Sequence, residues 1–279
     1  MNNFTLRVLT GILYLIVMIG SVVLSETSFL ALFLLITVLC VGEYHDITHK
    51  VIHVDTEWRT LYKFINTLFS ATIFFIVYLV AKRSIPLIAL SLVGGFPLVW
   101  CVIEMYSKSK TPFSNIAINS LALFYLAIPL SSASLLVYNT GDYSWNYLLA
   151  IMVFAWSNDS LAYVFGSQFG KHKLMERISP KKTWEGFFGG LGGAILFSYF
   201  VYLLFPSLTG YDTPWNRYFA LSIITVISST YGDLAESMIK RNLNIKDSGT
   251  ALPGHGGFLD RFDGLIFSLP ACTLYLTFF

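Results

Sequence analysis

Long apolar runs separated by short polar connectors make up most of this chain. A helix needs ~20 mostly apolar residues to cross a bilayer, and nine runs approach that length: 6–24, 28–44, 62–80, 86–104, 116–137, 147–168, 187–205, 216–239 and 264–279. We therefore predict an all-α, polytopic membrane protein with about nine transmembrane helices. Pro129 falls inside the fifth run and should kink that helix, because proline lacks a backbone N–H.

Composition agrees with this class. Hydrophobic residues make up 55% of the 279 residues and charged residues 12%, about half the ~25% charged residues of soluble proteins. A net charge of +2 without a basic run argues against nucleic acid as a partner. No repeat or soluble appendage is visible. We expect one membrane domain, 1–279, with helices of 1–137 as scaffold and 147–279 carrying a cytoplasm-facing catalytic site.

The basic residues predict how the chain is oriented. With the N-terminus in the cytoplasm, fifteen of the 18 lysines and arginines fall on the cytoplasmic side, and only Lys82, Arg83 and Arg217 fall outside. This is the bias expected of membrane proteins. It places the charged loops 169–186 and 240–263 on the side where nucleotides are found. The first run, too long for a signal peptide and without a cleavage site, is expected to be a retained span.

Charge is concentrated where the eighth run ends and the ninth begins. Asp233 and Glu236 are three residues apart, as are Asp260 and Asp263, so each pair lies on one face of a helix. Two helix ends joined by a loop can aim several carboxylates at one point, and such oxygen ligands suit Mg²⁺. An interfacial salt-bridge cluster remains the alternative, in which these acids pair with Lys240, Arg241 and Arg261.

The loop between these helix ends reads LPGHGGF, from Leu252 to Phe258. Glycines such as Gly256 and Gly257 permit a positive φ and close approach of a ligand, and successive backbone N–H groups can bind phosphate. Lys246 and Arg261 add positive charge nearby. His255 either contacts a phosphate, orients a water or is merely structural.

A second polar region begins within the sixth run. Asn158 and Asp159 interrupt an apolar helix, and an intramembrane carboxylate is by default a functional hypothesis. The alternative is a structural hydrogen bond between Asp159 and a neighbouring helix.

The loop after the sixth run carries lysines ahead of the next helix. Ser179 or Thr183 is expected to cap that helix, with Pro180 in its first turn. A helix N-terminus beside lysines attracts polyanions, and the lysines in question are Lys171, Lys181 and Lys182. Alternatively, these lysines only follow the positive-inside bias.

Several motifs now carry a family resemblance. The segments SMIKR (237–241), KD (246–247), LPGHGGF (252–258) and DRFD (260–263) resemble the signature of phosphatidate cytidylyltransferases, also called CDP-diacylglycerol synthases. The upstream segment Phe169–Gly186 is similar to that family's second hallmark. The resemblance is specific over 155–264 and implies nine-helix membrane enzymes that use CTP and Mg²⁺, generally as homodimers. It also implies that Asp233 and Asp260 bind metal, with Asp263 close by. Whether a second, monovalent cation is present stays open.

The implied reaction is transfer of CMP from CTP to phosphatidate, which gives CDP-diacylglycerol and pyrophosphate for phospholipid biosynthesis. The expected metal ligands are Asp233, Asp260 and Asp263. The residues expected on CTP phosphates are Lys171, Lys181, Lys182 and His255. The residues expected on phosphatidate or pyrophosphate are Lys240, Arg241 and Arg261. Lys246, Asp159, Gly256 and Gly257 complete the predicted substrate-binding set. A bacterial inner membrane is expected from the compact length.

Two other functions stay open. A related enzyme that uses CTP on another lipid, such as a polyprenol kinase or an archaeal-type lipid cytidylyltransferase, would share the membrane helices. A cation transporter would place Asp159 and the acidic helix ends near the bilayer midplane, but it gives the glycine loop no role.

Overall fold

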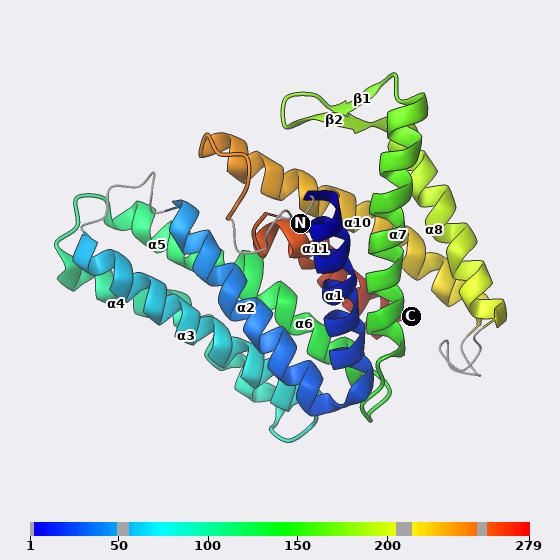
Figure 1. Cartoon of the computed structure of the whole chain (residues 1–279). Helices are drawn as coiled ribbons and strands as arrows, with labels where there is room; N and C mark the ends of the chain where they lie inside the picture. Colours follow the sequence, from blue (N-terminus) through cyan, green and yellow to red (C-terminus); the bar gives the residue numbers. More distant parts are fainter. Residues whose placement is uncertain (1–2, 49–55, 205–213, 250–255) are drawn as a thin grey trace. The chain divides into compact units, whose positions relative to one another are not determined.

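The computed structural model describes residues 3–48, 56–204, 214–249 and 256–279 (Figure 1). Helix covers the described part of each predicted apolar run. The chain divides into two compact units, one of 1–143 with 247–261 and the other of 144–246 with 262–279. The break at 143/144 lies between 1–137 and 147–279, and 247–261 belongs with the first unit. The scaffold and catalytic roles of these segments stay predictions.

The first unit is a bundle of helices. Its elements are α1 (Asn3–Leu24), α2 (Glu26–Thr48), α3 (Thr56–Ala81), η1 (Leu87–Gly95), α4 (Phe96–Ser107), α5 (Pro112–Ala122), η2 (Leu123–Ala127) and α6 (Ile128–Val137). Helix α3 packs against both α2 and α6. The centre of this packing is a buried apolar cluster of Ile73, Val77, Leu123 and Ala127.

The irregularity expected at Pro129 appears as a π-helical segment. The run 112–137 is α-helical except at η2 (Leu123–Ala127), directly before Pro129. A proline ring clashes with the carbonyl four residues earlier and donates no hydrogen bond. The wider π turn accommodates both effects.

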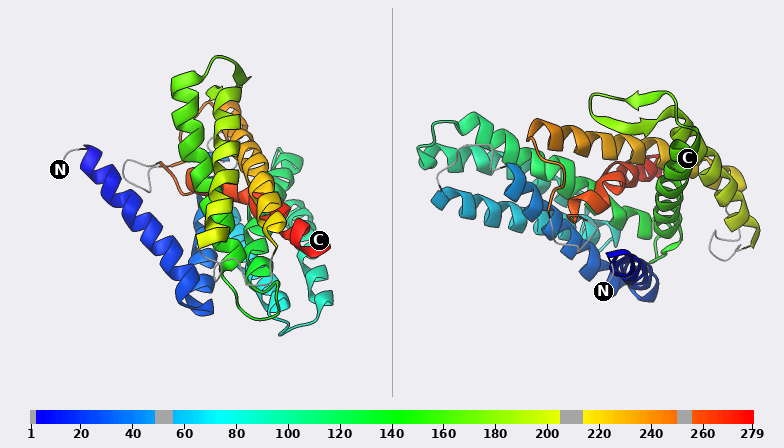
Figure 2. Two further views of the ribbon diagram at one scale, coloured as in Figure 1. Left: turned by 90° about the vertical axis from the view of Figure 1, so that its right-hand side faces the viewer. Right: turned by 45° about the horizontal axis from the view of Figure 1, so that its top comes forward.

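The second unit contains α7 (Asn146–Phe169), α8 (Trp184–Leu204), α10 (Trp215–Asn242) and most of α11 (Leu259–Phe278). Helices α7 and α8 lie side by side, joined by a hairpin of β1 (Lys173–Met175) and β2 (Ser179–Thr183) (Figure 2). The strands are antiparallel, and Lys173 pairs with Thr183.

This hairpin corrects one expectation. Pro180 lies in strand β2 and not in the first turn of a helix. Helix α8 begins only at Trp184, where the Thr183 hydroxyl accepts a hydrogen bond from the Gly186 N–H at 3.2 Å. Thr183 is therefore the capping residue, which was one of the two expected.

Six described helical segments are long and apolar enough to cross a membrane: Glu26–Thr48, Trp58–Ala81, Leu87–Ser107, Pro112–Val137, Asn146–Phe169 and Trp184–Leu203. The described apolar part of α1 is shorter, Val8–Leu24. Helices α10 and α11 do not reach the same standard, because α10 carries charge in its last turns and α11 starts with Asp260, Arg261 and Asp263. A polytopic helical membrane protein is confirmed, while the count of nine spans and the cytoplasmic N-terminus stay predictions.

Candidate functional site

A cavity of about 530 Å³ lies within the second unit, where α7, the hairpin, α8 and α10 meet. Four of the predicted site residues line it: Asp159, Lys181, Lys182 and Asp233. They come from three separate elements, so the fold brings together the two polar regions that the sequence suggested. Both carboxylates and ammonium groups face one space, which is the chemistry needed to bind a phosphate with a metal ion.

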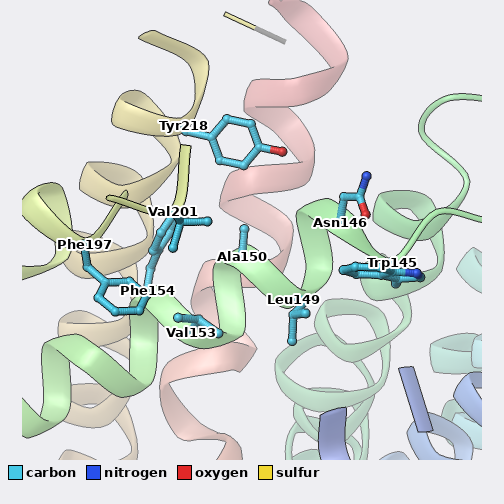
Figure 3. Close-up of a pocket in the computed structure, with 9 residues that line it drawn as sticks. All are labelled: Trp145, Asn146, Leu149, Ala150, Val153, Phe154, Phe197, Val201 and Tyr218. Atoms are coloured by element: carbon cyan, nitrogen blue, oxygen red, sulfur yellow. The ribbon is translucent and has the colours of Figure 1, made fainter. Parts of the chain in front are cut away.

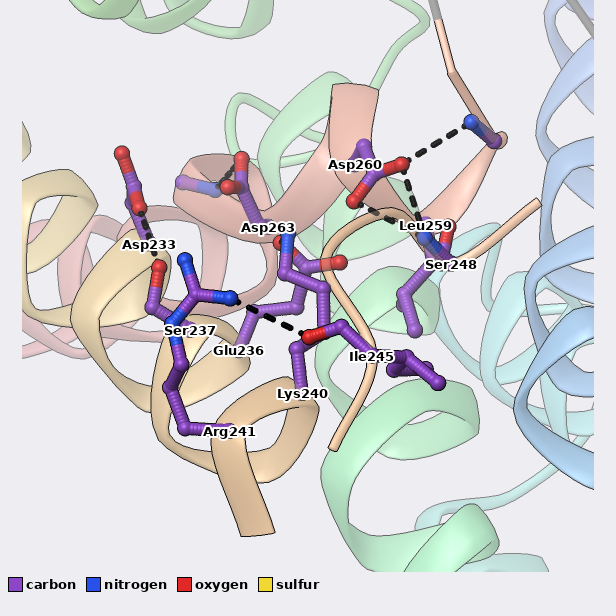
Figure 4. Close-up of polar contacts among 12 residues, drawn as sticks. Asp233, Glu236, Ser237, Lys240, Arg241, Ile245, Ser248, Leu259, Asp260 and Asp263 are labelled. Carbon is purple, nitrogen blue, oxygen red and sulfur yellow. Dashed lines mark hydrogen bonds and ion pairs between the residues drawn. The ribbon is translucent and has the colours of Figure 1, made fainter. Parts of the chain in front are cut away.

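Two of the charged side chains that line this cavity, Lys182 and Asp233, pair with each other. Lys182 Nζ lies 2.6 Å from Asp233 Oδ2. The other Asp233 oxygen accepts a hydrogen bond from the Ser237 hydroxyl at 3.2 Å, one helical turn further along α10 (Figure 4). The ammonium group of Lys182 therefore occupies the position on Asp233 that a metal ion would take.

Asp263 adds a further carboxylate to this region of the second unit. Helices α10 and α11 approach closely here, because a Cβ on Gly232 would overlap the main-chain carbonyl of Asp263. Burial of its carboxyl group, followed by the negative charges of Asp233 and Asp159, raises the pKa of Asp263 above its usual range. The Gly264 N–H, 2.6 Å from Oδ1, favours the ionised form.

Carboxylates that repel one another are stabilised by a bound cation. Asp233, Asp263 and Asp159 therefore fit Mg²⁺, which is usually held by one or two carboxylates together with water and substrate phosphates. Over 3–48, 56–204, 214–249 and 256–279, no group of three or more His, Cys, Asp or Glu side chains is arranged to hold a metal by itself.

Asp260 belongs to the first unit and makes different contacts. Its carboxylate accepts hydrogen bonds from the backbone N–H of Gly257 at 2.9 Å and of Ser248 at 3.1 Å (Figure 4). Gly256 lies between Ser248 and Gly257 in the sequence and has a φ of +86°. This confirms the positive φ expected of this loop. A Cβ there would lie 2.7 Å from Asp260 Oδ2, so the carboxylate and glycine positions depend on each other.

The remaining basic residues are placed unevenly. Lys240 pairs with the buried Glu236 at 2.9 Å on one face of α10. Arg241 donates to the Ile245 carbonyl at 3.1 Å. The other expected phosphate ligands, Lys171, Lys246 and Arg261, have exposed side chains, and Lys171 does not line the cavity. His255 lies outside the described residues.

Sequence reasoning missed several cavity residues. Lys173 lines the cavity in place of Lys171, and Thr230, one turn before Asp233 on α10, lines it too. The i, i−3 spacing from Asp233 is a signal that could have identified Thr230. Asn158, which the sequence singled out only as a polar residue in an apolar run, is buried beside Asp159 at the same cavity.

A second cavity in this unit is apolar. It has a volume of about 190 Å³ and is bordered by α7, α8 and α10 (Figure 3). Its lining is Trp145, Asn146, Leu149, Ala150, Val153, Phe154, Phe197, Val201 and Tyr218. With no charged side chain around it, this space suits hydrocarbon and does not suit phosphate.

Curated proteins with similar sequences share one name. Phosphatidate cytidylyltransferase of Staphylococcus epidermidis is 39% identical over 173 residues, which is 61% of this chain and 62% of the relative. The Staphylococcus aureus protein of the same name is 38% identical over 174 residues, with the same coverage. Phosphatidate cytidylyltransferase of Staphylococcus saprophyticus is 39% identical over 173 residues, which is also 61% of this chain and 62% of the relative. The match thus spans 62% of these relatives' length.

A broader comparison covers nearly all of this sequence. Residues 5–279 match the sequence profile of a family described as the cytidylyltransferase family. The match includes both cavity-lining regions and the glycine loop. The chain belongs to the cytidylyltransferase family.

Proposed function

We propose that this protein transfers CMP from CTP to phosphatidate and releases CDP-diacylglycerol and pyrophosphate. The observation that carries the proposal is the 530 Å³ cavity, in which Asp159 and Asp233 face Lys181 and Lys182. Family membership and the relatives named phosphatidate cytidylyltransferase support the same reaction. The apolar helices around the cavity suit a substrate that carries acyl chains.

In this reaction an oxygen of the lipid phosphate forms a bond to the α-phosphorus of CTP. The bond from that phosphorus to the oxygen bridging to the β-phosphorus breaks, and pyrophosphate leaves. Such transfers depend mainly on positioning and on neutralising charge. The lipid phosphate is already anionic, so no residue has to remove a proton from it.

The side chains divide into metal-binding and phosphate-binding groups. Asp233 and Asp263 would hold Mg²⁺ together with Asp260, as their donor chemistry allows, and Asp159 would add negative charge beside them. When bound, Mg²⁺ supplies positive charge next to the triphosphate. Lys181 and Lys182 would bind CTP phosphates, and Lys182 would leave Asp233 as it does so.

A second basic group would act on the lipid side of the reaction. Lys240, Arg241 and Arg261 would hold the phosphate of phosphatidate or the departing pyrophosphate. Planar guanidinium groups bind phosphate through two hydrogen bonds at once. The enzyme would work as a homodimer in a bacterial inner membrane, with the cavity open to cytoplasmic CTP.

Purified protein in detergent tests this proposal with phosphatidate, Mg²⁺ and CTP that is labelled in either the α- or the γ-phosphate. We expect α-label to enter the lipid phase, and EDTA or the Asp260→Asn substitution to abolish the transfer. Asp142→Asn is the matched control, because Asp142 is an exposed carboxylate in the loop before α7.

Two other outcomes would contradict the proposal. Lipid carrying γ-label would identify a lipid kinase. Folded protein that transfers neither label would exclude the enzyme, and cation flux in proteoliposomes that Asp159→Asn abolishes would then support a transporter.

A further inference from the structure

Glu43 lies near the end of α2, within the predicted scaffold, yet it contacts the glycine-rich loop. Its Oε2 accepts hydrogen bonds from the Leu259 N–H at 2.9 Å and from the Ser248 hydroxyl at 3.2 Å. All three residues belong to the first unit. Ser248 precedes the loop LPGHGGF and Leu259 follows it, so one carboxylate fastens both ends.

The same two loop ends also meet Asp260. The Ser248 N–H donates to the Asp260 carboxylate at 3.1 Å, while the Ser248 hydroxyl donates to Glu43. Figure 4 shows the Asp260 contacts at the start of α11. Ser248 is therefore shared between two carboxylates, and displacement of Glu43 would release one of the donors that place Asp260.

Two glycines allow Glu43 to come this close to the backbone. A Cβ on Gly249 would lie 2.8 Å from Glu43 Oε1, and a Cβ on Gly257 would lie 2.5 Å from Glu43 Oε2. Neither distance is compatible with a real side chain. These glycines therefore leave room for the Glu43 carboxylate beside the backbone. This role is separate from any contact between the loop and a phosphate.

The acceptor in this arrangement is a carboxyl group. Hydrogen bonds to a charged group are about twice as strong as those between neutral groups. Glu43 Oε1 is buried without a hydrogen-bond partner among the described residues, and such burial is unfavourable. The unfavourable burial of Oε1 occurs where Oε2 of the same carboxyl group holds Ser248 and Leu259.

We propose that Glu43 is a positioning residue for the cytidylyl transfer. It holds Ser248 and Leu259, on either side of the glycine-rich loop, and thereby the start of α11 and the orientation of Asp260. The proposal rests on the proposed function for its effect on catalysis, but the clamp itself is a structural claim that can be tested separately.

Three variants test it: Glu43→Ala removes the acceptor, Glu43→Gln keeps an acceptor without charge, and Asp46→Asn is the control. Asp46 lies one turn further along α2 and pairs with Lys63 at 2.6 Å, away from the loop. We expect Glu43→Ala to lower kcat about tenfold or more and to raise the Mg²⁺ concentration required for half-maximal rate. Glu43→Gln should recover part of both, and Asp46→Asn should match the parent protein.

Hydrogen–deuterium exchange of the same proteins measures the clamp without any turnover. The amides of 248–259 should exchange faster in Glu43→Ala, while those of α7 and α8 remain protected. Unchanged exchange over 248–259 would overturn the clamp even if the parent protein proved inactive. Faster exchange with unchanged kcat and Mg²⁺ dependence would overturn the role in catalysis.

A variant that fails to fold still leaves the question testable. Ser248→Ala removes only the hydroxyl that donates to Glu43, so we expect it to reproduce the faster exchange of the loop in part. In the Glu43→Gln background, Ser248→Ala should have a smaller effect than in the parent protein, because the hydrogen bond that it removes is weaker there. Independent, multiplicative effects of the two substitutions would show that the residues do not act through each other.

Discussion

At the scale of single residues, Lys182 and Asp233 form an ion pair within the cavity. Each neutralises the other at 2.6 Å, and both line the cavity that we propose for CTP. The proposed reaction requires both to change partners, Lys182 to a phosphate and Asp233 to a cation. Such an exchange keeps both of these partly exposed charges paired.

Lys182→Gln should therefore weaken CTP binding more than it weakens the fold. A hydrogen bond to a charged group contributes ~1.5–3 kcal/mol, so we expect the KM for CTP to rise about tenfold or more. Lys110→Gln is the matched control, since Lys110 is an exposed lysine in the loop before α5. An unchanged KM in Lys182→Gln would remove Lys182 from the nucleotide site.

At the residue scale, the structure groups four of the predicted site residues, while their roles stay predictions. Asp159, Lys181, Lys182 and Asp233 do share a cavity. The choice between Lys171 and Lys173 was beyond sequence reasoning, because the direction of each side chain depends on the register of the hairpin. The backbone partners of Asp260 likewise depend on how the loop closes.

At the scale of elements, the contact between α10 and α11 sets the distance between two carboxylates. Gly232 precedes Asp233 and packs on the Asp263 carbonyl. A Cβ on Gly264 would lie 3.1 Å from the Ser229 Cβ, so small residues occur on both sides of the crossing. Small residues let helices in membranes approach closely.

Gly232→Ala should force these helices apart. We expect a loss of ~1–3 kcal/mol of stability from overpacking, seen as a lower melting temperature in detergent, with most of the cytidylyl transfer lost. Gly192→Ala on α8 is the control, because a Cβ there meets nothing within 4 Å. That variant should be as stable as the parent or slightly more so, since alanine favours helix.

The hairpin of β1 and β2 shows why the predicted helix start at Ser179 and Pro180 was wrong. Ser-Pro followed by lysines is a reasonable helix start by local rules, and Thr183 does cap α8. Residues 179–183 instead pair with 173–175. That pairing is between two segments, so no property of 179–183 alone could have predicted it.

At the scale of the whole molecule, the distribution of basic residues predicts which side of the membrane carries the cavity. Arg177 occupies the exposed turn of the hairpin, and Asp142 occupies the exposed loop between α6 and α7. If the N-terminus is in the cytoplasm, Arg177 lies on the cytoplasmic side and Asp142 lies on the outer side.

Cysteine labelling tests this orientation. A membrane-impermeant maleimide added to intact cells should modify Asp142→Cys and leave Arg177→Cys unmodified until the cells are opened. The native Cys40, Cys101 and Cys272 lie in apolar helices, where a charged reagent does not reach. The reverse pattern would invert the predicted topology and place the cavity away from CTP.

The sequence by itself determined the membrane class, the helical segments, the loop glycines and the family resemblance. These are local properties, since hydropathy, capping and motif spacing are read from neighbouring residues. Tertiary structure alone decided which charges meet. Glu43 and Ser248 are separated by 205 residues along the chain, and only the folded helices bring that carboxylate to the loop it holds.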